Sequence, residues 1–356
     1  MLPNSDNGLR CGTCTKPFDI VVFGATSFVG QILCSYLFEQ FGLDGPVKWA
    51  AAGRSRSKLQ KLRESLGKKV AGLELLEANA DDDRALLALC RKGRVIASTV
   101  GPYALYGEPL IRACAESGTD YCDLAGEVQW MRRMIAQYEA RAAATGARIV
   151  HSCGFDSIPF DLGVHHLQSV ARQRLGAPYP EVKMRVRSMR GSFSGGTAAS
   201  IMNVVKEVAA NPALRKELAD PYSLCPSDYR PRVRQPAVAF AAYDPDFNGW
   251  IAPFVMSAVN TRLVHRTNAL SNQAYGAGFK YDEAMLTGRG LRGRLTAAGT
   301  STTLGAFMVA ASIGPLRSGL ERFVLPAPGS PAQGWLRSAV SGSWEGWPDP
   351  ADQGHR

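Results

Sequence analysis

The sequence predicts an α/β fold, in which a Rossmann-type doubly wound parallel sheet is followed by a second, α+β domain. Three observations lead to this expectation. Short apolar strand patterns alternate with amphipathic helix patterns over residues 18–152, as they do in parallel sheets. The first strand runs directly into a glycine-containing turn, "FGATSFVG" at 23–30. Beyond "CGFDSIPFDLG", residues 153–163, the alternation stops.

Six strands are expected in the first domain. The first, "FDIVVF", is apolar except for Asp19, which is typical of a strand covered on both faces. Each of the others follows a helix pattern or a turn. The six expected strands cover 18–23, 47–52, 73–78, 94–99, 119–124 and 147–152.

Helix patterns fill the intervals between these strands. Leu59, Leu62 and Leu66 share one helix face, and Gly67 is placed to end that helix. Further helices are expected over 82–91 and from Glu108–Pro109 to Gly118, with proline early and glycine late. A long helix with an apolar stripe follows before residue 147.

The second half has a different rhythm. Residues 181–191 alternate like a strand, 195–211 indicate a helix behind a glycine pair, and 221–253 are proline-rich and irregular. We therefore expect a disordered tail over 1–17, a nucleotide-binding domain over 18–153, a substrate domain over 154–325 and a poorly ordered tail over 326–356.

Composition narrows the class of protein. The 356 residues carry 41 basic and 31 acidic side chains, a net charge of +10 that favours anionic partners such as phosphates, an acidic carrier protein or a membrane surface. No nucleic-acid-binding module is recognisable, so nucleic acid is not an expected partner. Eight scattered cysteines and a polar N-terminus without an apolar stretch indicate a reducing, cytoplasmic location. The pair Cys11 and Cys14 lies in a polar tail and no second pair completes a metal site, so no metal is predicted.

Residues 295–316 are the one candidate for membrane contact. They carry no charged side chain between Arg294 and Arg317 and are long enough to span a bilayer. They also contain three glycines, a proline and several hydroxyl residues, so the segment is only weakly hydrophobic. We expect a buried or surface-lying helix, with peripheral contact to a membrane or lipid surface as the alternative.

A dinucleotide site is expected at the first turn. Gly24 allows the sharp turn after the strand, and Gly30 lies where the following helix packs on the sheet. Ser27 occupies the middle position of Gly24-x-x-Ser27-x-x-Gly30, where a third glycine is usual; a serine there can cap the helix or bind a phosphate. The alternative is a structural turn in a fold without a cofactor.

The end of the second strand indicates which cofactor binds. An NAD site usually places a carboxylate there, whereas this sequence has Gly53 followed by Arg54, with Ser55, Arg56 and Lys58 close behind. A guanidinium can pair with a 2′-phosphate that a carboxylate would repel, so we predict NADP(H). A solvated basic helix start explains Arg56 and Lys58 more readily than Arg54.

Candidate catalytic residues follow the fourth and sixth strands, at the carboxyl edge where ligands bind in such sheets. Tyr103, in the loop behind Gly101 and Pro102, could reach the nicotinamide. Tyr103 or Tyr106 could polarise a substrate carbonyl or donate the proton, and Tyr103 is the first candidate. Asp156 and Ser157 are candidates for substrate contact, although Ser157 or Asp161 can equally cap the next helix. The histidines at 151, 165 and 166 are interpreted as surface or packing residues.

Several of these segments together resemble the saccharopine dehydrogenase-like oxidoreductases, most closely the trans-acting enoyl reductases of lipid synthesis and their eukaryotic relatives. The similarity runs from about 18 to 325 and rests on these segments: "FDIVVFGATSFVG", "AAGRSRSKL", "TVGPYALYGEPLIRACAESGTDYCDLAGE", "CGFDSIPFDLGV", "SGGTAAS", "DPYSL" and "NTRLVHRTNALSNQAYGAGFKYDEAM".

The resemblance implies NADPH as the donor and reduction of an enoyl double bond on a lipid or polyketide chain delivered by a synthase, with an acidic acyl carrier protein as a candidate partner. It does not indicate an oligomeric state. Together with the turn and the loops, it predicts these cofactor-binding residues: Gly24, Ala25, Thr26, Ser27, Phe28, Val29, Gly30, Arg54, Ser55, Lys58, Gly101, Pro102 and Tyr103. The expected catalytic residues are Tyr103, Asp156 and Ser157.

Two departures and two alternatives accompany the resemblance. Ser27 replaces the usual glycine, and relatives continue past this C-terminus with further strands and a helix, whose absence is expected to weaken function. The first alternative is imine reduction in the manner of saccharopine reductase, with Arg185, Arg187 and Arg190 binding the carboxylates of an amino-acid substrate. The second is a catalytically idle NADP-binding protein that uses 295–316 as a lipid contact.

Overall fold

The computed structural model describes residues 16–188, 195–229, 231 and 233–325. The predicted tails over 1–17 and 326–356 lie outside this range, apart from Lys16 and Pro17. The chain forms two compact units. The first takes in the chain up to Thr99 with Pro109–Cys122 and Ala140–Ile149, and the second holds Val100–Glu108, Asp123–Glu139 and the chain from Val150. Division at residue 153 stays a prediction.

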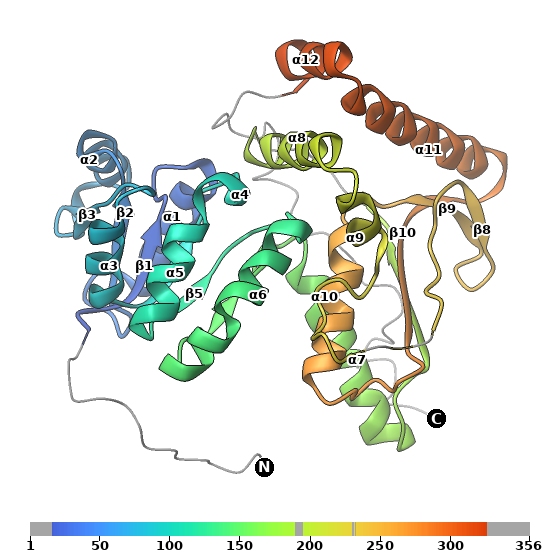
Figure 1. Ribbon diagram of the computed structural model, residues 1–356, viewed down its shortest axis with the longest axis horizontal. Helices are drawn as coiled ribbons and strands as arrows, with labels where there is room; N and C mark the ends of the chain where they lie inside the picture. Colours follow the sequence, from blue (N-terminus) through green and yellow to red (C-terminus); the bar gives the residue numbers. More distant parts are fainter. Residues whose placement is uncertain (1–15, 189–194, 230, 232, 326–356) are drawn as a thin grey trace. The chain divides into compact units, whose positions relative to one another are not determined.

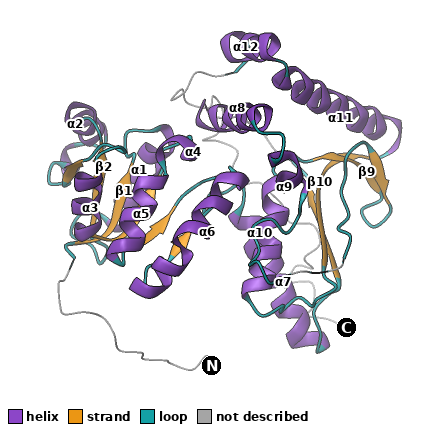
Figure 2. Ribbon diagram, in the orientation of Figure 1, coloured by secondary structure: helices purple, strands orange, loops and turns teal. Residues whose placement is uncertain are grey.

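A six-stranded sheet in the order β3-β2-β1-β4-β5-β6 confirms the Rossmann-type fold. Its strands pair in parallel, with β1 in register beside both β2 and β4. The strand order turns back on itself at β1, as it does in doubly wound sheets. Figure 2 shows the strands among the helices that connect them. The strands are β1 Phe18–Phe23, β2 Trp49–Gly53, β3 Leu75–Glu77, β4 Gly93–Ser98, β5 Asp120–Cys122 and β6 Ile149–Val150.

The connecting helices begin and end close to the predicted positions. The helix expected over 82–91 is α3, Asp83–Lys92, and the Asp82 side chain accepts hydrogen bonds from the backbone N–H groups of its first turn. Gly67 has a φ of 98° just beyond α2, as a glycine that ends a helix should. The helices are α1 Phe28–Phe41, α2 Arg56–Ser65, the short 3-10 helix η1 Lys68–Val70, α3, α4 Tyr103–Tyr106, α5 Glu108–Ser117 and α6 Val128–Thr145.

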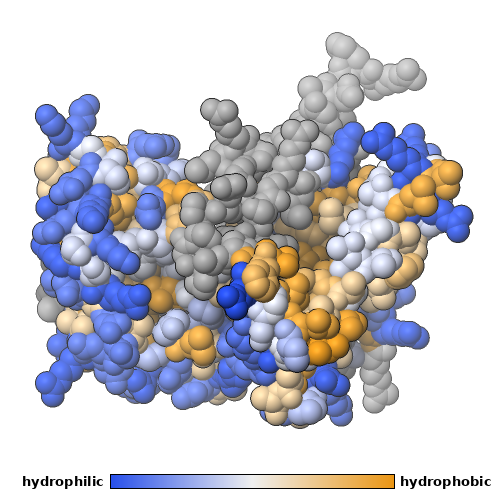
Figure 3. Space-filling view, turned by 90° about the horizontal axis from the view of Figure 1, so that it is seen from above, coloured by the Kyte–Doolittle hydropathy of each residue, from blue (hydrophilic) through white to orange (hydrophobic). Residues whose placement is uncertain are grey.

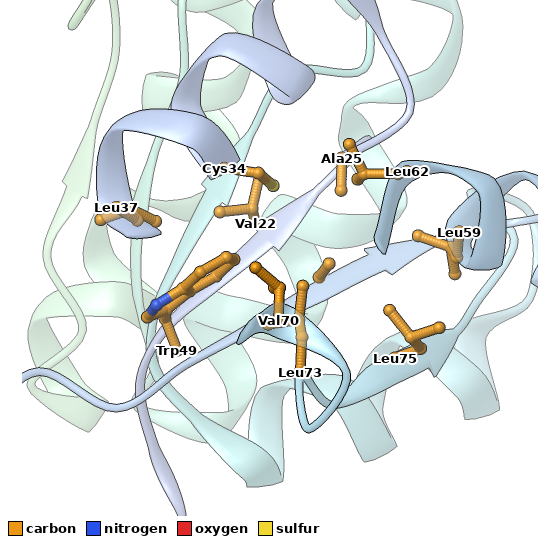
Figure 4. Packing of buried hydrophobic residues seen from close by; sticks show 11 residues of the cluster. Val22, Ala25, Cys34, Leu37, Trp49, Leu59, Leu62, Val70, Leu73 and Leu75 are labelled. Carbon is orange, nitrogen blue, oxygen red and sulfur yellow. The ribbon is translucent and has the colours of Figure 1, made fainter. Parts of the chain in front are cut away.

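The core on one side of β1 and β2 explains why the first strands are so apolar. Val22 and Ala51 from the sheet lie among side chains of α1, α2 and the segment before β3, all of them buried (Figure 4). Trp49 is the largest member of the cluster, and its indole N–H donates to the Gly42 carbonyl. Burying apolar side chains is worth about 1.5–3 kcal/mol each, so this cluster fixes the strand that carries the first turn.

A mixed sheet in the order β7-β10-β9-β8 organises the second unit. The β7 strand pairs in parallel with β10, whereas β9 is antiparallel to both β10 and β8. The prediction that 221–253 is irregular was wrong at its end, because β8 and β9 form a hairpin there. The hairpin is short, Pro245 lies in its turn and Pro253 ends its second strand, so neither strand shows a clear alternating pattern. The strands are β7 Glu181–Val186, β8 Ala242–Asp244, β9 Gly249–Pro253 and β10 Lys280–Gly288.

The remaining helices all belong to the second unit (Figure 1). Val164 of α7, Val264 of α10 and Tyr281 of β10 pack in one apolar cluster. The segment 295–316 falls within two helices, α11 and α12, instead of one. Among the described residues, no helix is both long enough and apolar enough to cross a membrane. These helices are α7 Ile158–Leu175, α8 Gly195–Ala210, α9 Leu214–Ala219, α10 Ser257–Leu270, α11 Gly290–Ser312 and α12 Gly314–Phe323.

Candidate functional site: a nucleotide turn and a buried polar cluster

The turn between β1 and α1 has the geometry of a dinucleotide-binding turn. Gly24 has a φ of 87°, a conformation that side chains with a Cβ rarely adopt. A Cβ added at Gly30 would lie 2.2 Å from the Gly24 carbonyl oxygen, so only glycine lets α1 begin this close to the turn. Both glycines therefore serve the close approach of helix to strand that such sites require.

Ser27 caps α1, which confirms one of the two predicted roles. Its Oγ accepts a hydrogen bond of 3.0 Å from the Gly30 N–H. The same oxygen lies 2.9 Å from Oγ1 of Thr99, and Thr99 Oγ1 is in turn 2.9 Å from the Gly24 carbonyl. Because Thr99 donates its proton to a carbonyl, the Ser27 hydroxyl is left to donate to Thr99. Thr99 therefore fixes the hydroxyl of Ser27, the residue that occupies the position of the usual glycine. Thr99 was not predicted from the sequence.

The end of β2 lies against this turn. The N–H groups of Gly24 and Ala25 both donate to the Ala52 carbonyl at 3.0 Å. A Cβ at Gly53 would be 3.9 Å from the Thr26 hydroxyl, so the two loops lie side by side. Residues directly after Gly53 are therefore well placed to meet a group bound at the turn.

Arg54 and Arg56 differ in their surroundings. Arg56 donates from Nη1 to the Leu75 carbonyl of β3, so its guanidinium is already used within the fold. Arg54 is exposed and has no hydrogen-bond or ion-pair partner among the described residues. Ser55 caps α2, its Oγ accepting from the Lys58 N–H at 3.5 Å. Of the predicted residues, Arg54 is thus the guanidinium available to a phosphate.

These features fit NADP(H). The glycines leave room that a Cβ would fill, the N-terminus of α1 offers amide donors to a phosphate, and a cation follows β2 where an NAD site has a carboxylate. No aspartate or glutamate occupies positions 53 to 58.

The loop behind β4 lies in the second unit and is held by Glu127. Oε1 accepts from the Tyr103 N–H at 2.8 Å and Oε2 accepts from the Ala104 N–H at 3.0 Å. Ser200 of α8 also donates to Oε1, at 2.9 Å. Glu127 is fully buried, and this burial raises the pKa of its carboxyl in spite of the three donors. It fixes the start of α4 and, through Ser200, the position of α8 against that loop.

Tyr103 itself is buried. Its side chain is 5% exposed, its hydroxyl oxygen accepts from the Leu124 N–H at 3.1 Å, and its ring lies 5.5 Å from that of Trp130. Gly107 is needed at the other end of the loop, since a Cβ there would come 2.5 Å from the Trp130 ring. Tyr106, by contrast, is 48% exposed.

An aspartate and a histidine form a buried pair where β5 and β6 end. Asp123 Oδ2 lies 2.7 Å from Nδ1 of His151, and the two side chains are 0% and 7% exposed. Oδ1 of Asp123 accepts from the N–H groups of Ala125 and Ser152, both at 2.9 Å. The Trp130 ring meets the His151 ring edge-on, with centroids 5.3 Å apart. The interpretation of His151 as a surface or packing residue was therefore incomplete, because its side chain also pairs with Asp123.

The segment after β6 carries a strained residue. Ser152 has a φ of 59°, which residues other than glycine rarely adopt. Its hydroxyl donates to the Ala125 carbonyl at 2.6 Å while its N–H is held by Asp123. Such strain persists only where the surroundings enforce it, and it is common at functional sites.

Asp156 and Ser157 lie on the next turn. Burial raises the pKa of the Asp156 carboxyl, because it disfavours the charged form. Ser157 is 2% exposed and stands at the N-cap position of α7, but its side chain makes no capping hydrogen bond. Asp161 lies inside α7 and accepts from Thr267 at 2.8 Å, so it is not a cap either.

Glu283 is a further buried carboxyl that was not predicted from the sequence. Asn260 of α10 donates from Nδ2 to the Asp156 carbonyl at 3.0 Å and to Glu283 of β10 at 3.1 Å. The Tyr281 hydroxyl donates to the other oxygen of Glu283, at 2.7 Å. Glu283 is 2% exposed, and burial raises its pKa to about 8.

The arginines proposed for a carboxylate substrate are not all available. Arg185 is 3% exposed and pairs with both Asp244, at 2.7 Å, and Asp282, at 3.0 Å. Both ion pairs lie within the second sheet, so the Arg185 guanidinium is not available to bind a substrate carboxylate. Arg187 is exposed, and Arg190 lies outside the described residues.

Metal ligands do not gather in the described part of the chain, where no cluster of three or more His, Cys, Asp or Glu side chains could hold a metal ion. The Cys11 and Cys14 pair lies outside the described residues.

The fold and the turn define a dinucleotide-binding domain, and comparison with known proteins agrees. The saccharopine dehydrogenase NADP-binding domain matches residues 20–150. A Mycobacterium tuberculosis (strain ATCC 25618 / H37Rv) protein, provisionally named as a trans-acting enoyl reductase, is 40% identical over 323 residues, 88% of this chain and 76% of the relative. The trans-acting enoyl reductase of Mycobacterium bovis (strain BCG / Pasteur 1173P2) is 36% identical over 299 residues, 81% of this chain and 70% of the relative.

The chain therefore belongs to the trans-acting enoyl reductases, within the saccharopine dehydrogenase-like proteins, and is an NADP-dependent oxidoreductase. Among solved structures, the saccharopine dehydrogenase (L-Glu forming) of Saccharomyces cerevisiae is similar at 16% identity, with a TM-score of 0.38 over 50% of this chain and 37% of that chain.

Proposed function

We propose that this protein uses NADPH to reduce the α,β-double bond of an acyl chain presented as a thioester on a carrier. The observation that carries the proposal is the turn around Gly24 and Gly30 with Arg54 beside it, in a chain 36–40% identical to trans-acting enoyl reductases. When bound, NADPH supplies the hydride. The net charge of +10 suits an acidic carrier protein as the partner that delivers the substrate.

The first unit would hold the cofactor. Backbone N–H groups at the start of α1, from Thr26 to Val29, would bind the pyrophosphate, and Ala25 follows the strand closely enough to line the turn. Arg54 would pair with the 2′-phosphate, with Ser55 and Lys58 beside it. Ser27 acts through the turn, since its hydroxyl is bound to Thr99 and Gly30.

The second unit would bind the substrate. We assign the loop of Gly101, Pro102 and Tyr103 to the nicotinamide end of the cofactor, and the Tyr103 hydroxyl to the enolate oxygen that develops during reduction. Asp156 and Ser157 would contact the acyl thioester. Tyr103→Phe tests this role, because it removes the hydroxyl and keeps the ring that packs beside Trp130.

The test is NADPH oxidation, followed at 340 nm, with an enoyl-pantetheine thioester. We expect turnover with the enoyl thioester and none with the imine formed from an α-amino acid and an aldehyde. Turnover of the imine alone would replace this proposal with the saccharopine reductase-like alternative, which the double ion pair of Arg185 does not favour.

A lipid-surface contact is a second candidate for part of the chain. Leu291, Leu295 and Val309 of α11 are 61–70% exposed, and Phe323 of α12 is 79% exposed. Figure 3 shows apolar patches among polar side chains on the face that it draws. Sedimentation with anionic vesicles tests this; a protein that stays in the supernatant would exclude it.

A reducing, cytoplasmic location is also proposed. The six described cysteines all carry free thiols, including Cys90 and Cys114, whose sulfurs lie 3.5 Å apart. Two thiols this close would be expected to oxidise in an oxidising compartment.

A further inference from the structure

The Asp123–His151 pair has the construction of an acid–base unit. Asp123 is fully buried, and its Oδ1 accepts hydrogen bonds from two backbone N–H groups. These bonds fix the carboxylate so that Oδ2 faces the imidazole. A carboxylate oxygen only accepts hydrogen bonds, and Nδ1 of His151 therefore carries a proton. A second ring nitrogen, Nε2, is then the position at which a proton is gained or lost.

Three further observations place this pair in a functional setting. Asp123 and His151 directly follow β5 and β6, neighbouring strands of a parallel sheet, at the edge where ligands bind in such folds. The residue after the histidine, Ser152, is held in a strained conformation by the same aspartate. Trp130 contacts both the imidazole and the Tyr103 ring, so the pair belongs to one cluster with the tyrosine.

We propose that His151, oriented by Asp123, supplies the proton that the substrate α-carbon takes up during reduction. This inference rests on the proposed enoyl reduction and adds a residue to it. In the reaction, the β-carbon forms a bond to hydride from NADPH, and the π electrons of the double bond move toward the α-carbon and the thioester oxygen. The α-carbon then forms a bond to the proton from Nε2, the N–H bond breaks, and the imidazolium becomes a neutral imidazole that regains its proton from water.

Other groups near the histidine are less suited to this step. The Tyr103 hydroxyl has been assigned to the oxygen of the same intermediate, and the Cys153 thiol lies against backbone carbonyls, 3.6 Å from that of Val150. Asp156 lies on the following turn and burial raises the pKa of its carboxyl, which makes it the strongest competitor. The experiment must therefore separate His151 from Asp156.

The decisive measurement is the stereochemistry of the α-carbon when the reaction runs in D₂O. A positioned donor adds deuterium to one face, whereas water adds it to both. We expect the wild type to give one configuration, and His151→Gln and Asp123→Asn to give mixtures with kcat lowered about 10²- to 10⁴-fold. Exogenous imidazole should restore part of the rate of His151→Gly. His166→Gln, which changes an exposed histidine on α7, is the matched control and should keep both rate and configuration.

Folding and cofactor binding are followed separately. NADPH fluorescence titration should give the same affinity for all variants, which shows that each is folded. A single configuration and an unchanged rate in His151→Gln would overturn the proposal, and a mixed configuration in Asp156→Asn alone would assign the step to Asp156.

The pair can also be tested without turnover. In ¹⁵N-labelled protein, His151 should appear with Nδ1 protonated in the wild type and lose this preference in Asp123→Asn. If the wild type reduced no enoyl thioester while this NMR result held, the proposed function would fail and the pair would stand as a feature of the fold. Absence of the Nδ1 proton would overturn the pair itself.

Discussion

Glu283 should make the stability of the second unit depend on pH. Its carboxyl is 2% exposed, and burial raises its pKa from 4.5 to about 8, in spite of hydrogen bonds from Tyr281 and Asn260. Because the folded value lies above the unfolded one, the folded protein keeps a proton that the unfolded chain releases between these pH values. The free energy of unfolding must therefore fall as the pH rises from about 4.5 to about 8.

The pKa values set the size of the effect. At 1.36 kcal/mol per pKa unit, the difference between 4.5 and about 8 corresponds to a loss of at most about 5 kcal/mol. Dipoles that reorient around the charged carboxylate recover part of this, and we expect a loss of about 2–4 kcal/mol. In Glu283→Gln, the amide mimics the protonated acid, since its oxygen can still accept from Asn260 and its N–H groups can donate to the Tyr281 oxygen. The variant should therefore be more stable than the wild type at pH 8.5 and within about 1 kcal/mol of it at pH 5.5.

Urea unfolding at the two pH values, followed by tryptophan fluorescence, measures the difference directly. Other titrating groups contribute equally to both chains, so the comparison isolates Glu283. Glu181→Gln, which changes an exposed glutamate at the start of β7, is the control and should follow the wild type. If wild type and Glu283→Gln lose the same free energy between pH 5.5 and 8.5, the assignment of a buried neutral carboxyl is refuted.

Three further changes test the cofactor turn and the loop behind β4. Arg54→Ala removes a charged hydrogen-bond donor to the 2′-phosphate. In fluorescence titrations it should therefore weaken NADPH binding about 10- to 100-fold and leave NADH binding unchanged. The control Lys61→Ala, at an exposed position on α2, should leave the binding of both cofactors unchanged. Gly30→Ala should lower the melting temperature and abolish NADPH binding, since its Cβ would lie 2.2 Å from the Gly24 oxygen, whereas Gly299→Ala, with no atom within 4 Å of the added Cβ, should be neutral or stabilising. Glu127→Gln should cost about 1.5–3 kcal/mol in urea unfolding because an amide N–H would face a backbone N–H of α4, and unchanged stability would contradict the described role of that carboxylate.

The nucleotide turn was predictable because its signals are local. A buried strand, a glycine with positive φ and a helix start lie within 13 consecutive residues, 18–30. Each of these features is indicated by the residue types at its own positions. Arg54 was assigned from its position at the end of the second strand; it is exposed there, and its role at the 2′-phosphate stays a prediction. The helix-capping role of Ser27 was predicted, but its contact with Thr99 was not, because Thr99 lies 72 residues further along the chain.

The polar groups of the second unit needed tertiary structure. Glu127 acts on backbone amides 23 and 24 residues before it, and no local pattern marks a carboxylate as a partner of a distant loop. Glu283 lies in a strand whose neighbours are mostly buried, so its burial could be suspected but its partner Asn260 could not. For Asp123 and His151 a signal did exist, since both lie close to the carboxyl ends of consecutive predicted strands, 119–124 and 147–152. Neither residue alone indicates the pair. The pair becomes visible only when the ends of the two adjacent strands are compared.

In the proposed mechanism, the two units would divide the chemistry between them. The cofactor elements proposed for the first unit offer amide donors, Arg54 and Lys58, all suited to an anion, and none of them is a carboxyl or imidazole group. In the second unit, burial raises the pKa of Glu127, Asp156 and Glu283. Cofactor choice and proton delivery should therefore vary independently. A change at Arg54 should alter the KM for NADPH while the α-carbon keeps its configuration in D₂O, and a change at His151 should do the reverse. Joint loss of both in either variant would mean that one structural element controls both steps, which these separate sets of contacts do not support.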